Sequence, residues 1–145
     1  MRTYSPKKGD YEEKWYMVDA KDQVVGRLAS RVAAVLRGKH MPGFAPHMSP
    51  NTHVIVINAD QARFTGRKMS EKKYYHHTGY PGGIKSTTPK ELLEKKPEEI
   101  IRHAVRGMIP KNSLGRATMK RLRIYTGSEH PHKAQMPETL EIETR

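Results

Sequence analysis

Short apolar runs along the chain alternate with stretches that have helical spacing. Trp15–Val18 predicts a strand, and Asp19–Gln23 predicts the turn after it. The run VIVI at Val54–Ile57 is continuous and β-branched, which is typical of a strand covered on both faces. Further strands are predicted at Leu122–Tyr125 and, shorter, at Arg63–Thr65. The VIVI strand indicates a sheet enclosed between helices.

The clearest helix is predicted over Arg27–Arg37, which Gly26 precedes and Gly38 follows as a C-cap. Its apolar face is formed by Leu28, Val32, Val35 and Leu36, with Ala29 and Ala33 alongside. Arg27 and Arg31 fall on the other side, so the exposed face of this helix is basic.

Three more helices are expected in the second half of the chain. Thr87 or Thr88 caps one that has Pro89 in its first turn and runs to about Lys95. Pro97 begins the next, which Gly107 and Pro110 end. Its apolar face is predicted to comprise Ile100, Ile101, Ala104, Val105 and Met108. A short helix is predicted around Arg116–Arg121.

The remaining segments predict irregular structure. His40–His53 carries three prolines and cannot be regular, and Met108–Arg116 is cationic and rich in turn residues. The chain therefore divides into a basic N-terminal arm at 1–14, one α/β domain at 15–126 and an extended C-terminal tail at 127–145. Loops at about 66–88 and 108–116 belong to the domain.

Charge changes this picture more than any other property of the composition. The 145 residues carry 27 Lys and Arg against 15 Asp and Glu, a net charge of +12. Such an excess favours a polyanionic partner, meaning nucleic acid or an anionic membrane. No apolar run approaches the ~20 residues that span a bilayer, and the N-terminal stretch with Asp10, Glu12 and Glu13 resembles neither a signal nor a transit peptide. A cytoplasmic nucleic-acid binder is the class that composition favours.

Lys72–Lys85, with the sequence KKYYHHTGYPGGIK, is the segment least typical of an ordinary soluble domain. It places lysines among tyrosines and histidines on a backbone that three glycines allow to turn sharply. Cations beside flat rings suit RNA, which offers both phosphates and stackable bases. The alternative is a glycine-rich turn whose tyrosines pack into the domain. If the backbone is extended, Tyr74 and Tyr75 point in opposite directions, so one ring should face RNA and the other the core.

Three other kinds of site are disfavoured. The helix after Gly26 lacks the further glycines and the lysine of nucleotide-binding loops. The histidine pairs His76–His77 and His130–His132 have no carboxylate or thiol at ligand spacing, and the chain has no cysteine. No serine or threonine near a histidine has an acidic partner, so an enzyme is not expected.

Six segments in order give the chain a family resemblance. They are VDAKDQVVGRLAS at Val18–Ser30, LRGKH at Leu36–His40, VIVINA at Val54–Ala59, YYHHTGYPGGIK at Tyr74–Lys85, HAVRGMIPKNSLGR at His103–Arg116 and GSEHPHKAQMPE at Gly127–Glu138. With these segments the sequence resembles the bacterial ribosomal protein L13 family over about Trp15–Glu138. Met41 and Met136 depart from it where the family leads us to expect a basic residue, and Thr139–Arg145 match nothing.

The resemblance implies a three-layer α/β/α fold with a four-stranded, mostly parallel sheet, plus extended basic loops and terminal arms. It also implies a structural constituent of the large ribosomal subunit that binds 23S ribosomal RNA, contacts neighbouring subunit proteins and assists early subunit assembly. Neither a cofactor, a metal, a membrane nor a small-molecule substrate is expected. The alternative is a free regulatory module that binds RNA or DNA.

The basic segments and the resemblance together predict the residues that contact RNA. They are Arg27, Arg31, Arg37, Lys39, His40, Arg67, Lys68, Lys72, Lys73, Tyr74, Tyr75, His76, His77, Tyr80, Gly82, Gly83, Lys85, Arg106, Lys111, Asn112, Arg116, Lys120, Arg121, His130 and His132.

Overall fold

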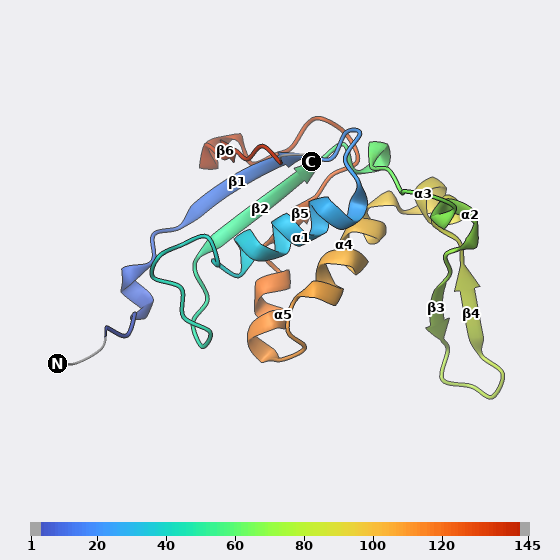
Figure 1. Ribbon diagram of the computed structural model, residues 1–145, viewed down its shortest axis with the longest axis horizontal. Helices are drawn as coiled ribbons and strands as arrows, with labels where there is room; N and C mark the ends of the chain where they lie inside the picture. The colour runs from blue at the N-terminus through green and yellow to red at the C-terminus, as the bar shows by residue number, and fades with distance from the viewer. Residues whose placement is uncertain (1–3, 143–145) are drawn as a thin grey trace.

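A four-stranded sheet with helices on one face organises the chain (Figure 1). The computed structural model describes residues 4–142, so the outer ends of the predicted arm and tail lie outside the described residues. The elements are η1 (Lys8–Asp10), β1 (Lys14–Asp19), α1 (Val25–Leu36), β2 (Thr52–Ile57), η2 (Ala59–Gln61), α2 (Lys68–Glu71), β3 (Tyr74–His77), β4 (Ile84–Thr87), α3 (Pro89–Lys95), α4 (Pro97–Met108), α5 (Ser113–Met119), β5 (Leu122–Ile124), η3 (Lys133–Gln135) and β6 (Glu138–Thr139).

The sheet has the strand order β5-β2-β1-β6, and every neighbouring pair is parallel. β1 and β2 occupy the centre, where Tyr16 lies opposite Val54 and Val18 opposite Val56. The central place of β2 explains its unbroken apolar run, because both of its faces are covered. The prediction of an α/β fold with a four-stranded, largely parallel sheet is confirmed.

The main core lies between the sheet and the helices α1 and α4, which pack against each other. Leu28 of α1 and Ile101 of α4 are fully buried, as are Val54 and Val56 of β2. Burial of such aliphatic side chains contributes about 1.5–3 kcal/mol each to the free energy of unfolding. This packed layer fixes the positions of the helices and strands that carry the surface side chains described below.

The opposite face of the sheet is covered by the chain that follows β5, so the third layer is thin. Trp15 of β1 stacks on His53 of β2 with ring centroids 4.2 Å apart, and His132 lies 5.2 Å from the same indole ring. After η3 the chain adds the edge strand β6 to β1. The segment that we predicted to be an extended tail thus contributes a strand that its sequence did not indicate.

A glycine ends α1 in the way that the sequence predicts. Gly38 has φ +74°, its amide donates to the carbonyl of Val35, and the amide of Lys39 donates to Ala34. These two bonds satisfy the last carbonyls of the helix. A Cβ on Gly38 would also overlap the ring of Pro50, so the glycine lets the proline-rich loop fold back against the helix end.

Several predicted helix boundaries are wrong. The first helix begins at Val25, so Gly26 lies inside its first turn, and the helix predicted at Arg116–Arg121 is α5, which ends at Met119. Gly107 lies within α4, where the helix tolerates it near its end. Met108, which we placed on the buried face of α4, is 44% exposed.

The strand predictions also need correction. Arg63–Thr65 is not a strand; only Arg63 forms an isolated bridge, with Val24. The irregular stretch ends earlier than predicted, because Thr52 and His53 already belong to β2. The predicted N-cap of α3 is confirmed, since the Thr88 hydroxyl accepts a hydrogen bond from the amide of Glu91.

Candidate nucleic-acid interface

The glycine- and tyrosine-rich segment forms an antiparallel hairpin that extends away from the body (Figure 1). β3 and β4 are joined by a turn in which the amide of Thr78 donates to Gly83 at 2.9 Å. Gly79 and Gly82 have φ values of +89° and +70°, which other residues rarely adopt. The segment is therefore an arm of two strands, whereas the sequence predicted an RNA-facing loop.

The hairpin exposes large side chains that a chain normally buries. Tyr75 is 67% exposed, Tyr80 76% and Ile84 65%. Tyr74 differs: it is half-buried, and its ring lies 5.6 Å from that of His103 on α4. Burial raises the pKa of the Tyr74 hydroxyl. The prediction that one of the two adjacent tyrosines faces the body is confirmed, and Tyr75 is the one that faces outward.

Cations follow the hairpin on both strands. Lys73 and Lys85 are exposed, as are His76 and His77. The Lys72 ammonium instead lies 5.1 Å from the ring centroid of Tyr74, which helps to fix the base of the arm. Arg67 is the N-cap of α2 and Lys68 its first residue; beside this base they line an open groove of about 750 Å³ with the start of α1.

A second cationic surface lies where α4, α5 and β5 meet. Two adjoining hollows of about 440 and 490 Å³ share Arg106 and Met119. They bring together six basic residues: Arg102, Arg106, Lys111, Arg116, Lys120 and Arg123. We call this surface the α4–α5 groove. Two of its residues, Arg102 and Arg123, were not predicted, although Arg102 stands one helical turn before Arg106 and Arg123 is the exposed middle residue of β5.

Exposed cations of α1 form a third surface. Arg27 and Arg31 lie on its outer face, and Lys39 and His40 follow its end. Burial lowers the pKa of the His40 imidazole, and the nearby Arg31 and Lys14 lower it further. The His40 imidazole is therefore neutral near pH 7 and has one ring N–H to donate in a hydrogen bond.

Some of the predicted contact residues already have partners within the chain. The Arg121 guanidinium donates to the Ser49 hydroxyl, and at 3.2 Å each to the Pro50 carbonyl and the Asn51 side chain. Asn112 caps α5 by accepting from the amide of Gly115 at 2.7 Å. These interactions give Arg121 and Asn112 a structural use that the sequence did not reveal.

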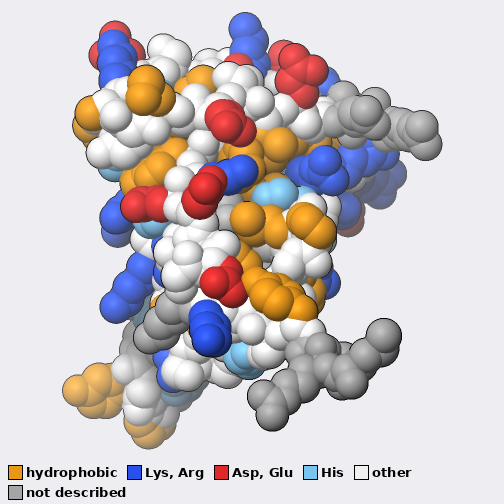
Figure 2. Space-filling view, turned by 90° about the vertical axis from the view of Figure 1, so that its left-hand side faces the viewer, with side chains coloured by type: hydrophobic (Ala, Val, Ile, Leu, Met, Phe, Trp, Pro, Cys, Tyr) orange, Lys and Arg blue, Asp and Glu red, His pale blue; other side chains and the backbone are white. Residues whose placement is uncertain are grey.

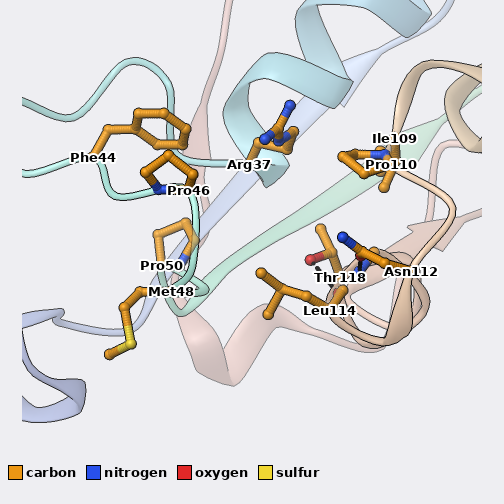
Figure 3. Close-up of a pocket in the computed structure, with 11 residues that line it drawn as sticks. Arg37, Phe44, Pro46, Met48, Pro50, Ile109, Pro110, Asn112, Leu114 and Thr118 are labelled. Atoms are coloured by element: carbon orange, nitrogen blue, oxygen red, sulfur yellow. Dashed lines mark hydrogen bonds between the residues drawn. The ribbon is translucent and has the colours of Figure 1, made fainter.

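A small pocket lies beside these residues, between the proline-rich loop and the turn that joins α4 to α5 (Figure 3). Arg37 and Phe44 line one side of it, and Pro110 and Thr118 the other. The Arg37 guanidinium lies 5.8 Å from the ring centroid of Phe44. The pocket holds about 30 Å³, far less than the roughly 300 Å³ of a small-molecule site. It is a packing gap between two loops.

His130 and His132 belong to an aromatic group on the thin side of the sheet. The Tyr125 hydroxyl is 2.8 Å from Nε2 of His132, and the His132 amide donates to Nδ1 of His130 at 3.2 Å. Partial burial lowers the pKa of His132, and the neighbouring Arg123 and His130 add to the effect. Among residues 4–142 no three His, Asp or Glu side chains gather as a metal site would require.

The surface beside η1 and η3 has a different character. In Figure 2, acidic side chains lie among lysines, arginines and apolar groups over this face. A mixture of both signs is typical of a solvated surface. The unbalanced cations thus concentrate on the hairpin, the outer face of α1 and the α4–α5 groove. Within residues 4–142, no helix combines the length and apolar character needed to cross a membrane.

Comparison with known proteins identifies the family. Residues 13–131 match the model of ribosomal protein L13. This chain belongs to the ribosomal protein L13 family. It is 57% identical over 142 residues to the large ribosomal subunit protein uL13 of Beutenbergia cavernae, covering 98% of this chain and 97% of that protein. The corresponding proteins of Halorhodospira halophila and Micrococcus luteus are 54% and 53% identical, each over 98% of this chain and over 100% and 97% of their own lengths.

The L13 family match includes the sheet up to β5, the hairpin and the α4–α5 groove, and it ends before η3 and β6. The similarity to the individual relatives extends further, because it covers nearly the whole of both chains. The resemblance stated from six sequence segments is confirmed.

Proposed function

We propose that this protein is a structural constituent of the large ribosomal subunit, that it binds 23S ribosomal RNA, and that it assists early assembly of the subunit. It acts in the cytoplasm on the ribosome, without a cofactor and without catalysing a reaction. The observation that carries the proposal is the agreement of two independent findings. Close relatives over the full length are large-subunit proteins, and the chain presents cations without balancing acids on a rigid body.

The mechanism follows from the placement of charge. Lysines and arginines of the hairpin, of α1 and of the groove neutralise backbone phosphates, while Tyr75 and Tyr80 contact bases or sugars. Because these groups stand on different parts of one body, contacts at several of them hold RNA segments in a fixed relative position. Neighbouring subunit proteins are expected to contact the mixed-charge face, where no single sign dominates.

A sucrose gradient at high salt tests the proposal most directly. The protein should sediment with the large subunit, whereas a free regulatory RNA- or DNA-binding module would remain near the top. Omission of the protein from a subunit reconstitution should then leave incomplete particles. Slow sedimentation under all salt conditions would contradict the proposal and favour the regulatory module.

The salt dependence of RNA binding tests the hairpin separately. Replacement of Lys73 and Lys85 by Ala should reduce the slope of log affinity against log salt by roughly 0.7–0.9 for each lost phosphate contact. The matched control replaces Lys90 and Lys95, two exposed lysines of α3, by Ala. An equal change of slope in both variants would mean that the hairpin lysines act only through the total charge.

A further inference from the structure

The α4–α5 groove and the hairpin offer RNA different chemistry, although both are cationic. We infer that the α4–α5 groove binds the sugar–phosphate backbone of a double-helical RNA segment, and that the hairpin binds unpaired bases. This inference rests on the proposed function and names the kind of RNA that each surface takes.

The lining of the groove is cationic throughout. Of the described residues that line its two hollows, six are Lys or Arg and none is Asp or Glu. Arg102 is held on α4 by Glu99, with 3.0 Å between guanidinium and carboxylate, and by Glu98 at 3.8 Å. The other five basic residues form no ion pair within the described part of the chain under a 4.0 Å limit. Their charge is free to meet phosphates.

The cations of the groove stand on a rigid frame. Arg106 lies one turn after Arg102 on α4, and Lys120 one turn after Arg116 at the end of α5, a rise of about 6 Å in each case. The turn between these helices is tightly packed, because a Cβ on Gly115 would overlap the carbonyl oxygen of Pro110. Spacing that is set before binding suits a regular duplex, whose phosphates are also fixed beforehand.

The groove offers bases no aromatic ring to stack on. Its apolar lining consists of Ile109, Pro110, Met119 and Leu122 together with Gly115, and no aromatic ring belongs to it among the described residues. Proteins that bind single strands hold the bases against aromatic side chains, which contribute about 1–3 kcal/mol per base. A surface of cations without aromatic rings suits the phosphate backbone, which a double helix presents with its bases already stacked inside.

The hairpin has the complementary set of groups. The side chains of Tyr75 and Tyr80 are mostly exposed. The exposed His76 and His77 add two more rings, and Lys73 and Lys85 lie near them in the hairpin. The arm is narrow and stands clear of the body, so a ring on it can reach into an RNA loop (Figure 1). This is the chemistry of a stacking platform for unpaired bases.

The test measures binding of the full chain to two RNA probes over a range of salt concentrations. One probe is a fully paired RNA duplex of about 16 base pairs, and the other is an unstructured single-stranded RNA of about 16 nucleotides. The groove variant carries Arg106→Gln, Arg116→Gln and Lys120→Gln. Its control, called the α3 control, carries Lys90→Gln and Lys95→Gln on α3 and Lys96→Gln at the C-cap of that helix, which removes the same charge from exposed positions elsewhere. The hairpin variant carries Tyr75→Ser and Tyr80→Ser.

The groove variant should lose duplex affinity by about tenfold or more, with a salt slope smaller by roughly 2–3, while the α3 control loses about threefold or less. The hairpin variant should lose about 5- to 150-fold in single-strand affinity for each ring that stacks on a base, and leave duplex binding within about threefold. Far-UV circular dichroism and urea unfolding must match wild type for all three variants.

Equal loss of duplex affinity in the groove variant and its α3 control overturns the inference, because the groove would then act only through net charge. Equal loss of both probes in either the groove or the hairpin variant overturns the division of labour between the two surfaces. Either result can occur while the protein still sediments with the large subunit, so the inference can fail without the proposed function. Absence from the subunit would overturn the proposed function itself.

Discussion

The body and the β3–β4 hairpin place similar side chains in opposite environments. Ile101 of α4 is fully buried between α1 and the sheet, whereas Ile84 of β4 is 65% exposed. The body buries most of its large apolar side chains in its own core, while the hairpin leaves two tyrosines and an isoleucine exposed to solvent. A two-stranded hairpin without a core is only marginally stable in water, so these side chains contribute little to the folding of the chain. Exposed apolar side chains of this kind are typical of an interaction surface, which the proposed RNA contact would use.

The first prediction compares one substitution at both places. Ile101→Ala should lower the free energy of unfolding by about 2–5 kcal/mol, because it removes buried methylene groups and leaves a cavity in the core. Ile84→Ala should change it by about 0.5 kcal/mol or less, since the side chain is already largely hydrated. Urea unfolding followed by circular dichroism measures both. Similar losses in the two variants would show that the hairpin is part of the cooperative core.

The second prediction concerns two glycines at opposite sides of the α4–α5 turn. Gly115→Ala should destabilise the body by about 1–3 kcal/mol, because the new methyl group would overlap the Pro110 carbonyl. Gly107→Ala has open space around its Cβ and lies within a helix, so it should stabilise by about 0.5–1 kcal/mol. Thermal unfolding of both variants checks the opposite signs; a loss in Gly107→Ala would contradict the packing described here.

The third prediction separates two adjacent rings of the hairpin. Tyr74→Ala should cost about 1 kcal/mol of unfolding free energy and loosen the arm, because the ring contacts His103 and Lys72. Tyr75→Ala should leave stability within about 0.5 kcal/mol and instead weaken RNA binding. Hydrogen exchange of the hairpin amides reports the first effect and RNA titration the second. Loss of protection in Tyr75→Ala would mean that both rings hold the arm.

The body was predictable from sequence because its rules are local. Each of three features follows from a single physical cause that acts on neighbouring residues. They are the buried VIVI run of β2, the Thr88 N-cap of α3 and Gly38 with positive φ at the end of α1. Errors in the helix boundaries, such as the start of α1 at Val25, arose because a glycine near a helix start can lie on either side of it. The sequence of β6 has no pattern typical of a strand, because these two residues become a strand only by pairing with β1.

The candidate interface was less predictable, because it depends on what the fold brings together. The composition of the hairpin segment indicated RNA contact, but its pairing into β3 and β4 was missed because each strand has only four residues and the glycines and proline of the turn lie between them. Arg123 was overlooked because only the fold places β5 beside Arg106, whereas the position of Arg102 one turn before Arg106 could have been read from the sequence. Conversely, Arg121 looks like any surface arginine in the sequence, although it fastens the loop before β2.

The smallest expected effect is a loss of folding stability in acid, and it concerns histidines of the body. The histidines whose pKa the structure lowers, His40, His53 and His132, all lie in the body. For His53 burial is the main cause, and Arg121, Arg123 and His132 lower its pKa further while Glu13 at 3.4 Å opposes them. Its Nδ1 is buried without a hydrogen-bond partner, so a proton added there would find no acceptor.

These lowered pKa values fix the sign of the pH dependence. Below pH 6.5, the ordinary histidine value, the unfolded chain binds more protons than the folded one. The stability that neutral imidazoles provide is therefore fully present above pH 6.5 and is lost as the pH falls through the lowered pKa values. Urea unfolding between about pH 7.5 and pH 5.5, where carboxylates stay ionised, should show the decline. His53→Gln should reduce this decline, because it removes one of the imidazoles whose pKa the fold lowers. The His53 imidazole stacks directly on the indole ring of Trp15. A decline as steep in His53→Gln as in wild type would show that protonation of this imidazole does not cause the loss of stability in acid.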